Sequence, residues 1–220
     1  MIRFKVCCIL NQAEVNLAVR YGASAVGLVS AMPSGPGVIA EDTIRELAHA
    51  VPPGVDSFLL TSLRDTPAII EQQRRLGAST IQLVDSLATG THADLRAALP
   101  GVKIVQVVHV TGEESIDEVR ALGDSVHAIL LDSGRPDLAV KELGGTGRVH
   151  NWEISRAIVE AARVPVYLAG GLSPDNVGAA IAAVRPFGVD VCSGLRTGAA
   201  KELDERKLAT FAEIVHAASL

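Results

Sequence analysis

The chain alternates between short apolar runs rich in β-branched residues and amphipathic stretches of helical length such as "EDTIRELAHAV" and "PAIIEQQRRLGA". Strands buried on both faces read as continuous apolar runs, which is typical of parallel sheets covered by helices. The alternation therefore predicts repeated strand–helix units. The expected strands are Arg3–Ile9, Ala25–Val29, Asp56–Thr61, Thr80–Val84, Lys103–Val110, Val126–Leu131, Val164–Leu168 and Gly188–Cys192.

Eight such units follow one another without a Gly/Ser-rich linker or a shift in composition. This organisation predicts an α/β fold in which residues 1–220 form a single (β/α)8 barrel domain, a TIM barrel. An open doubly wound sheet is the structural alternative. In a barrel the active site lies at the carboxyl ends of the strands, so the residues after each strand are the candidates for function.

Composition limits the partners. The chain has 20 Lys and Arg against 25 Asp and Glu, a formal net charge of −5, which argues against nucleic acid and anionic membrane surfaces. No apolar stretch reaches the roughly 18 residues that a membrane span needs, and the N-terminus does not resemble a signal peptide. Three cysteines do not make a disulfide framework, so we expect free thiols and a cytoplasmic location.

Glycine-rich segments follow the last three expected strands. Glycines let backbone amides approach an anion closely, and late loops of a barrel commonly bind phosphate. Three such segments after consecutive strands favour a phosphate site over plain turns. The expected phosphate-binding residues are Gly144, Gly145, Thr146, Gly147, Gly170, Gly171, Ser193 and Gly194.

Cys7 and Asp132 lie near the ends of the first and sixth strands. Strand periodicity places Lys5, Cys7 and Ile9 on one face and Cys8 on the other. A thiol and a carboxyl group facing each other across the barrel mouth could act as base and acid. The thiol, with an ordinary pKa of about 8.5, would need a lowered pKa for this role. Packing is the simpler interpretation of a buried cysteine.

Several motifs resemble those of the phosphoribosylanthranilate isomerase family, in order and over nearly the whole chain. "KVCCILN" resembles the family's "KICGITN", and "ILLDS" followed by "GGTGRVHNW" resembles "LLLDS…GGTGKTFDW". "LAGGLSPDNVGAAI" and "GVDVCSG" resemble "LAGGLNPENVAEAI" and "GVDVSSG". The resemblance implies a (β/α)8 isomerase of tryptophan biosynthesis.

What the resemblance implies is the Amadori rearrangement, an aldose–ketose isomerisation of N-(5-phosphoribosyl)anthranilate. The family's general base falls on Cys7 and its general acid on Asp132, and the glycine segments would hold the phosphate. Asp132 would protonate the ring oxygen, and Cys7 would remove the C2′ proton. The family uses no cofactor and no metal, and it includes monomers and homodimers.

The chain departs from the family's motifs where the amine half of the substrate binds. Cys8 stands where the family has glycine, Gly37 and His109 stand where it has arginines, and Val84 replaces a histidine. Losing an arginine that pairs with a carboxylate typically costs a few kcal/mol. The residues considered for binding the amine half of the substrate, the aglycone, are therefore Gly37, His109 and Arg135. Other candidate cations are Arg64, Arg148 and Arg196.

These departures leave two alternatives to the main interpretation. One is an Amadori isomerase for a different phosphoribosylamine, and the other is a non-catalytic protein that binds a phosphosugar.

Cys192 raises a further question, because the last strand of a closed barrel neighbours the first and brings Cys192 towards Cys7 or Cys8. Packing is the favoured role of Cys192 over metal binding, and a Cys8–Cys192 bridge formed on oxidation is a hypothesis.

Overall fold

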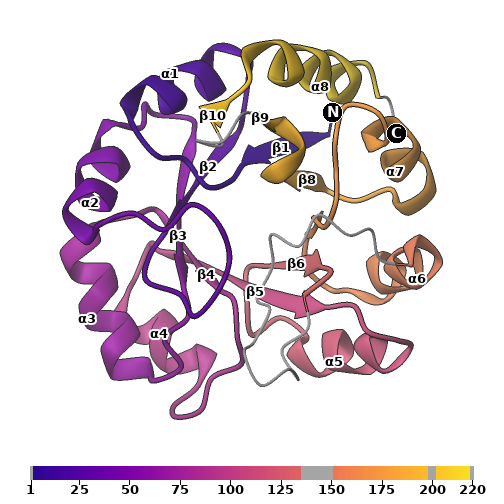
Figure 1. Ribbon diagram of the computed structural model, residues 1–220. Coiled ribbons are helices and arrows are strands. Elements are labelled where there is room, and N and C mark those ends of the chain that lie inside the picture. The colour runs from indigo at the N-terminus through magenta and orange to yellow at the C-terminus, as the bar shows by residue number, and fades with distance from the viewer. Residues whose placement is uncertain (1, 135–150, 198–201, 219–220) are drawn as a thin grey trace.

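Eight parallel strands close into a ring, and β9 and β10 form a separate two-stranded sheet, as shown by a computed structural model that describes residues 2–134, 151–197 and 202–218 (Figure 1). Parallel β1 pairs with β2 on one side and with β8 on the other, so the sheet has no edge at β1. The prediction of a (β/α)8 barrel is confirmed, and the open-sheet alternative is wrong. The elements are β1 (Arg3–Val6), α1 (Gln12–Arg20), β2 (Ala25–Val29), α2 (Glu41–Ala50), β3 (Asp56–Thr61), α3 (Thr66–Leu76), β4 (Thr80–Leu83), α4 (His92–Ala98), β5 (Lys103–His109), α5 (Glu114–Leu122), β6 (Ala128–Asp132), α6 (Trp152–Ala161), β7 (Val166–Leu168), α7 (Val177–Val184), β8 (Gly188–Val191), the 3-10 helix η1 (Ser193–Leu195), β9 (Arg196–Thr197), β10 (Glu202–Leu203) and α8 (Glu205–Ala217).

The helices surround the strands, and local sequence fixes where several of them begin and end (Figure 1). Asp65 caps α3 by accepting from the Ala68 amide, and Gly77 ends the helix with a left-handed φ of 71°. Thr91 and Asp94 form a reciprocal capping box at α4. Among the helices of the described ranges, none has the length and apolar character needed to cross a membrane.

The barrel has two apolar regions. A large outer core, which includes Val6, Ile9 and Leu28, packs between the strands and the helices. A smaller inner cluster, which includes Phe58, Tyr167 and both Cys7 and Cys8, fills the inside of the ring. Burial on both sides explains why every residue of β2 is buried and why the strands read as continuous apolar runs.

The first strand ends earlier than its apolar pattern predicts. Regular β1 stops at Val6, although the Cys7 amide still donates to the Val191 carbonyl (2.8 Å). Cys8 then adopts a left-handed φ of 61°, which costs a non-glycine residue about 1–2 kcal/mol. This turn shifts the alternation of faces, so Cys8 joins Cys7 inside the barrel and Ile9 packs outside. The prediction that Cys7 and Ile9 share one face and Cys8 the other was wrong.

The remaining strands lie close to their expected positions. Ala25–Val29 and Asp56–Thr61 match β2 and β3, and the other five differ by one or two residues at one end or, for β6, at both. The difference at β6 matters for the site, because the strand extends to Asp132 and makes this carboxyl group its last residue.

Candidate active site

A pocket lies at the carboxyl ends of the strands, and its empty space, including the part that is open to solvent, is about 650 Å³. Cys7 follows β1, Asp132 ends β6, Gly170 and Gly171 follow β7, and Ser193 follows β8, and all five line it. These strands are consecutive in the closed ring, with β7 and β8 between β6 and β1. Cys7 and Asp132 therefore share the pocket, although β1 and β6 are not directly opposite each other.

A buried ion pair lies beneath the Cys7 thiol. Lys5 Nζ is 2.7 Å from Asp190 Oδ2, and the Lys5 side chain is fully buried. Burial disfavours the Lys5 ammonium ion, but attraction to Asp190 and, more weakly, to Cys7 outweighs this, so the pKa of Lys5 is raised. A fixed positive charge therefore sits inside the barrel next to the thiol.

Gly27 of β2 makes room for both side chains. A Cβ atom at this position would lie 2.8 Å from Cys7 Sγ and 3.2 Å from Lys5 Cε. The absence of a side chain at Gly27 thus lets the thiol lie next to the lysine stem, against the strand.

Replacing Gly27 by alanine is expected to displace the thiol of Cys7, the base that the sequence predicts, and to lower kcat/KM by about tenfold to a hundredfold, because small misplacements of a catalytic group have effects of this size. The measurement is steady-state kinetics beside thermal unfolding. Gly178→Ala in α7 is the matched control, because Gly178 does not line the pocket and an added Cβ atom there would lie 3.3 Å from its nearest neighbour, Ile214. Unchanged kinetics in Gly27→Ala would show that the position of the thiol does not limit the rate.

The two adjacent thiols have pKa values shifted in opposite directions. A hydrogen bond from the Cys8 thiol lowers the pKa of Cys7 from its ordinary value; burial opposes the shift, and the charge of Lys5 adds to it. The pKa of Cys8 is raised by its hydrogen bonds with Cys192 and Cys7 and by burial. Cys7 is therefore the thiol favoured as a thiolate, as a base requires.

The pKa of Asp132 is shifted in the direction that suits a general acid. Burial raises the pKa of Asp132 to about 6, and the negative charge of Asp190 adds to this, although the Ser133 amide donates to Asp132 Oδ1 at 2.7 Å and opposes the shift. The carboxyl group consequently keeps a useful protonated fraction near neutral pH. One pocket thus holds a thiol with a lowered pKa and a carboxyl group with a raised pKa, which is the pattern of an acid–base site.

The glycine segments after β7 and β8 pack closely together. Gly170 and Gly171 have left-handed φ values of 84° and 63°. A Cβ at Gly194 would lie 2.9 Å from the Leu172 carbonyl carbon and from Ser173 Cα, and closer still to the Leu172 oxygen. Only glycine permits this approach of the two backbones. The other predicted phosphate residues, Gly144, Gly145, Thr146 and Gly147, lie outside the described residues.

Gly37 and Cys8, two departures from the family's motifs, are in contact. Gly37 has a φ of 81°, and a Cβ there would lie 2.9 Å from Cys8 Cα and 3.0 Å from Cys8 Sγ. The Cys8 side chain therefore occupies the space in which a side chain at position 37 would begin, which explains sterically why the two departures occur together.

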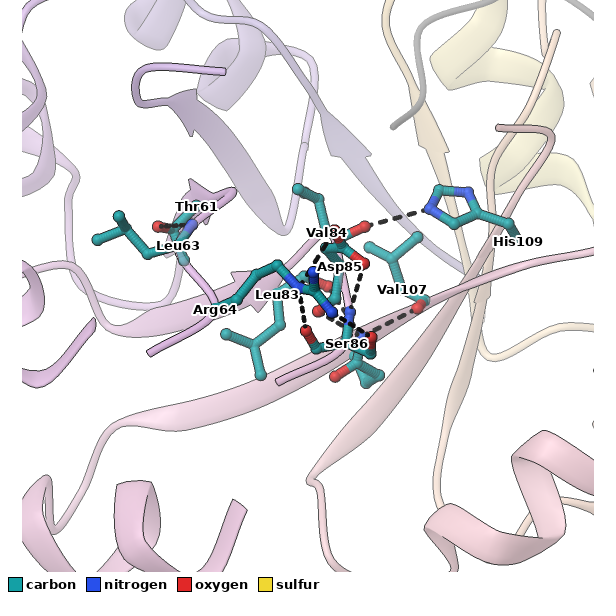
Figure 2. Close-up of polar contacts among 10 residues, drawn as sticks. Thr61, Leu63, Arg64, Leu83, Val84, Asp85, Ser86, Val107 and His109 are labelled. Atoms are coloured by element: carbon teal, nitrogen blue, oxygen red, sulfur yellow. Dashed lines mark hydrogen bonds and ion pairs between the residues drawn. The ribbon is translucent and has the colours of Figure 1, made fainter. Parts of the chain in front are cut away.

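His109, Arg64 and Arg196 do not line the pocket, and each of them has a structural partner. Figure 2 shows the His109 ring directed at the Val84 carbonyl (Nε2···O 3.1 Å), and Arg64 bound to the Ser86 carbonyl (2.8 Å) and near Asp85 (3.5 Å). Arg196 is buried and pairs with Glu14 at 2.9 Å. Arg135 and Arg148 lie outside the described residues.

Sequence reasoning missed the buried Lys5–Asp190 and Glu14–Arg196 pairs. A signal was available for the first pair, because Lys5 and Asp190 each lie between two apolar residues of a strand, where an unpaired charge is costly. Their partnership depends on β1 and β8 being neighbours, with Lys5 in register with Asp190. Barrel closure, and not the sequence order, creates this pair.

The chain forms a closed (β/α)8 barrel with a thiol, a carboxyl group and glycine-rich turns at the carboxyl ends of its strands. This arrangement is typical of the class of (β/α)8-barrel enzymes. The model of the N-(5'-phosphoribosyl)anthranilate (PRA) isomerase family matches residues 4–213. The N-(5'-phosphoribosyl)anthranilate isomerase 2 of Methanosarcina mazei is 36% identical over 96% of this chain and 92% of its own length. The Haloferax volcanii N-(5'-phosphoribosyl)anthranilate isomerase is 38% identical over 93% and 89%.

The crystal structure of the phosphoribosyl anthranilate isomerase from Thermotoga maritima has a TM-score of 0.81 and 26% identity to this chain, covering 98% of it and 99% of the other. The chain therefore belongs to the N-(5'-phosphoribosyl)anthranilate isomerase family. The resemblance inferred from the motifs is confirmed.

Proposed function

We propose that this protein catalyses the Amadori rearrangement of N-(5'-phosphoribosyl)anthranilate in tryptophan biosynthesis. Family membership supports the substrate, and the relatives favour anthranilate over another amine. The observation that carries the chemistry is the pair of opposite pKa shifts on Cys7 and Asp132 in one pocket. A retired, purely binding scaffold has no need for this pair.

In the proposed mechanism the Asp132 carboxylic acid donates its proton to the furanose ring oxygen, and the C1′–O bond breaks to give a Schiff base. The Cys7 thiolate then removes the C2′ proton, and the enolamine that forms tautomerises to the ketone as C1′ takes up a proton. C1′ is reduced and C2′ is oxidised within one molecule. Only protons are exchanged with the protein, so the proposal includes no cofactor and no metal.

The proposed phosphate site comprises Gly170, Gly171, Ser193 and Gly194 together with the 144–147 segment. Its support is the close packing of the turns after β7 and β8 at the pocket wall. Binding the phosphate there would hold the sugar between Cys7 and Asp132 and supply part of the rate enhancement by positioning.

The proposed site for the anthranilate ring lies on the side of the pocket after β2 and β3. Val29, Met32, Pro36 and Leu60 line the pocket there, and such a surface suits an aromatic ring. We propose that Gly37 borders this half of the substrate, and that His109, the last residue of β5, and Arg135, which follows β6 in the sequence, approach it from the other side of the pocket. The base must remain an unoxidised thiol, so the proposal includes a cytoplasmic location. We also propose that residues 1–220 form one domain and that the protein is a monomer or a homodimer.

Incubation of the protein with N-(5'-phosphoribosyl)anthranilate in D₂O tests the proposal. We expect rapid loss of substrate fluorescence and a product that carries solvent deuterium at C1′, because the enolamine takes up its proton from a group that exchanges with solvent. Mass spectrometry and NMR of the product are the measurements. The anthranilate assignment would be contradicted if the folded protein did not convert N-(5'-phosphoribosyl)anthranilate but did convert a phosphoribosylamine with another amine. Ligand binding with no turnover of either would favour the non-catalytic alternative.

A further inference from the structure

Two thiols that the proposed mechanism does not use lie side by side at the pocket. Cys8 Sγ and Cys192 Sγ are 2.7 Å apart, and both residues line the pocket. They follow β1 and β8, which are neighbours in the closed barrel. Cys192 is only half-buried, so a small oxidant entering the pocket reaches the pair. We propose that Cys8 and Cys192 form a reversible oxidation site whose disulfide lowers the activity of the enzyme.

Contacts that do not involve sulfur hold Cys8 in place. Arg196 donates to the Cys8 carbonyl, and the same guanidinium pairs with Glu14 at 2.9 Å and 3.0 Å. The left-handed turn at Cys8 and the absence of a side chain at Gly37 direct the Cys8 thiol into the pocket. The two sulfur atoms lie within reach of a disulfide bond, so the bridge closes with a small relative movement of the two side chains. The reduced protein is thus already arranged for the bond.

The oxidation balances with a peroxide as the oxidant. Cys192, the more exposed of the two residues, attacks one peroxide oxygen as its thiolate, the O–O bond breaks, and the leaving hydroxide takes a proton to become water. The sulfenic acid that results is attacked by the second thiol, the S–S bond forms, and a second water leaves. The pair loses two electrons and two protons, and one hydrogen peroxide becomes two waters. A dithiol reductant reverses the change by thiol–disulfide exchange.

Disulfide formation would act on the base through Cys8. In the reduced protein a hydrogen bond from the Cys8 thiol lowers the pKa of Cys7, and Cys8 in a disulfide has no S–H group to donate. Cys8 is therefore a positioning residue, and its oxidation raises the pKa of the base and lowers the thiolate fraction at neutral pH. This consequence rests on the proposed role of Cys7, whereas the bridge itself does not.

Mass spectrometry of the full chain tests the bridge without relying on activity. Hydrogen peroxide treatment of reduced protein is expected to lower the mass by about 2 Da rather than to add the roughly 16 Da of an oxygen atom. The Cys7→Ser variant should still form the bridge, while Cys8→Gly and Cys192→Ser should not. Cys8→Gly suits the left-handed φ of 61° and so preserves the backbone. A bridge that includes Cys7, or no bridge in the wild-type protein, overturns the proposal.

Kinetics then test the switch, with each protein compared before and after peroxide treatment. The wild-type protein should lose about tenfold in kcat/KM at pH 7, with the rise of its pH profile moved to higher pH, and dithiothreitol should restore both. The ratio of oxidised to reduced activity of Cys192→Ser should stay near one. An equal loss of kcat/KM in the wild-type protein and in Cys192→Ser would overturn the proposal that the disulfide lowers the activity. A bridge in a protein that shows no isomerase activity when reduced would support the oxidation site and overturn the proposed function.

Discussion

Asp132→Asn is expected to lower kcat by about 10²–10⁴-fold, the range typical of a lost general acid, and to make the protein more stable at pH 8. Both effects have one cause, which is the burial that raises the pKa of Asp132 to about 6. Between the ordinary value of 3.8 and about 6, the native state holds this proton more tightly than the unfolded chain does. Stability therefore falls as pH rises through this window, and the full penalty is present above pH 6.

The penalty amounts to up to about 3 kcal/mol, because each pKa unit corresponds to about 1.4 kcal/mol. Asparagine stays neutral, so the gain in the free energy of unfolding should be seen at pH 8 and disappear near pH 4. Urea unfolding at the two pH values measures it. Asp117→Asn, on the surface of α5 with its carboxylate 81% exposed, is the control and should change neither activity nor pH dependence.

The pH profile of kcat/KM separates the two catalysts. The wild-type profile should bend near pH 6, where Asp132 titrates, and the residual activity of Asp132→Asn should lack that bend. Ionisation of the substrate phosphate would affect both proteins alike. Cys7→Ser should also lose activity, but without the stability gain at pH 8. An Asp132→Asn variant as unstable at pH 8 as the wild-type protein would contradict the raised pKa.

Asp190→Asn is expected to destabilise the protein by about 3–5 kcal/mol at pH 7, because it leaves the fully buried Lys5 ammonium without its partner. Chemical denaturation measures the loss. This loss of stability should become smaller at high pH. Without Asp190, burial lowers the pKa of Lys5 in the folded state, so the unfolded chain binds more protons than the folded protein does. The stability of the variant therefore rises with pH.

The double variant Lys5→Met/Asp190→Leu distinguishes a lost ion pair from lost packing. Replacing a whole buried pair with apolar residues is often neutral or stabilising, so the double variant should recover most of the stability. It should nevertheless show slower catalysis, since the charge of Lys5 helps to lower the pKa of Cys7. Asp42→Asn, which removes an exposed partner of Arg45, is the surface control and should have no measurable effect. A double variant as unstable as Asp190→Asn would mean that shape, not charge, dominates at this position.

The amino-acid sequence determined the barrel and the identity of the two proposed catalysts. Apolar runs such as Ala25–Val29 and Asp56–Thr61 became strands at the predicted residues, because burial on both faces of a parallel strand leaves a continuous apolar signal. Cys7 and Asp132 were found because barrel topology places the residues after every strand at one mouth.

Tertiary structure alone decided how those groups are tuned. The alternating pattern could not reveal the left-handed turn at Cys8, because φ depends on contacts such as the one with Gly37 that form only after folding. Ring closure puts β1 against β8, and so creates both the Lys5–Asp190 pair and the Cys8–Cys192 contact from residues more than 180 positions apart. Sequence supplies the chemical groups, but burial and distance set their pKa values, and both exist only in the closed barrel.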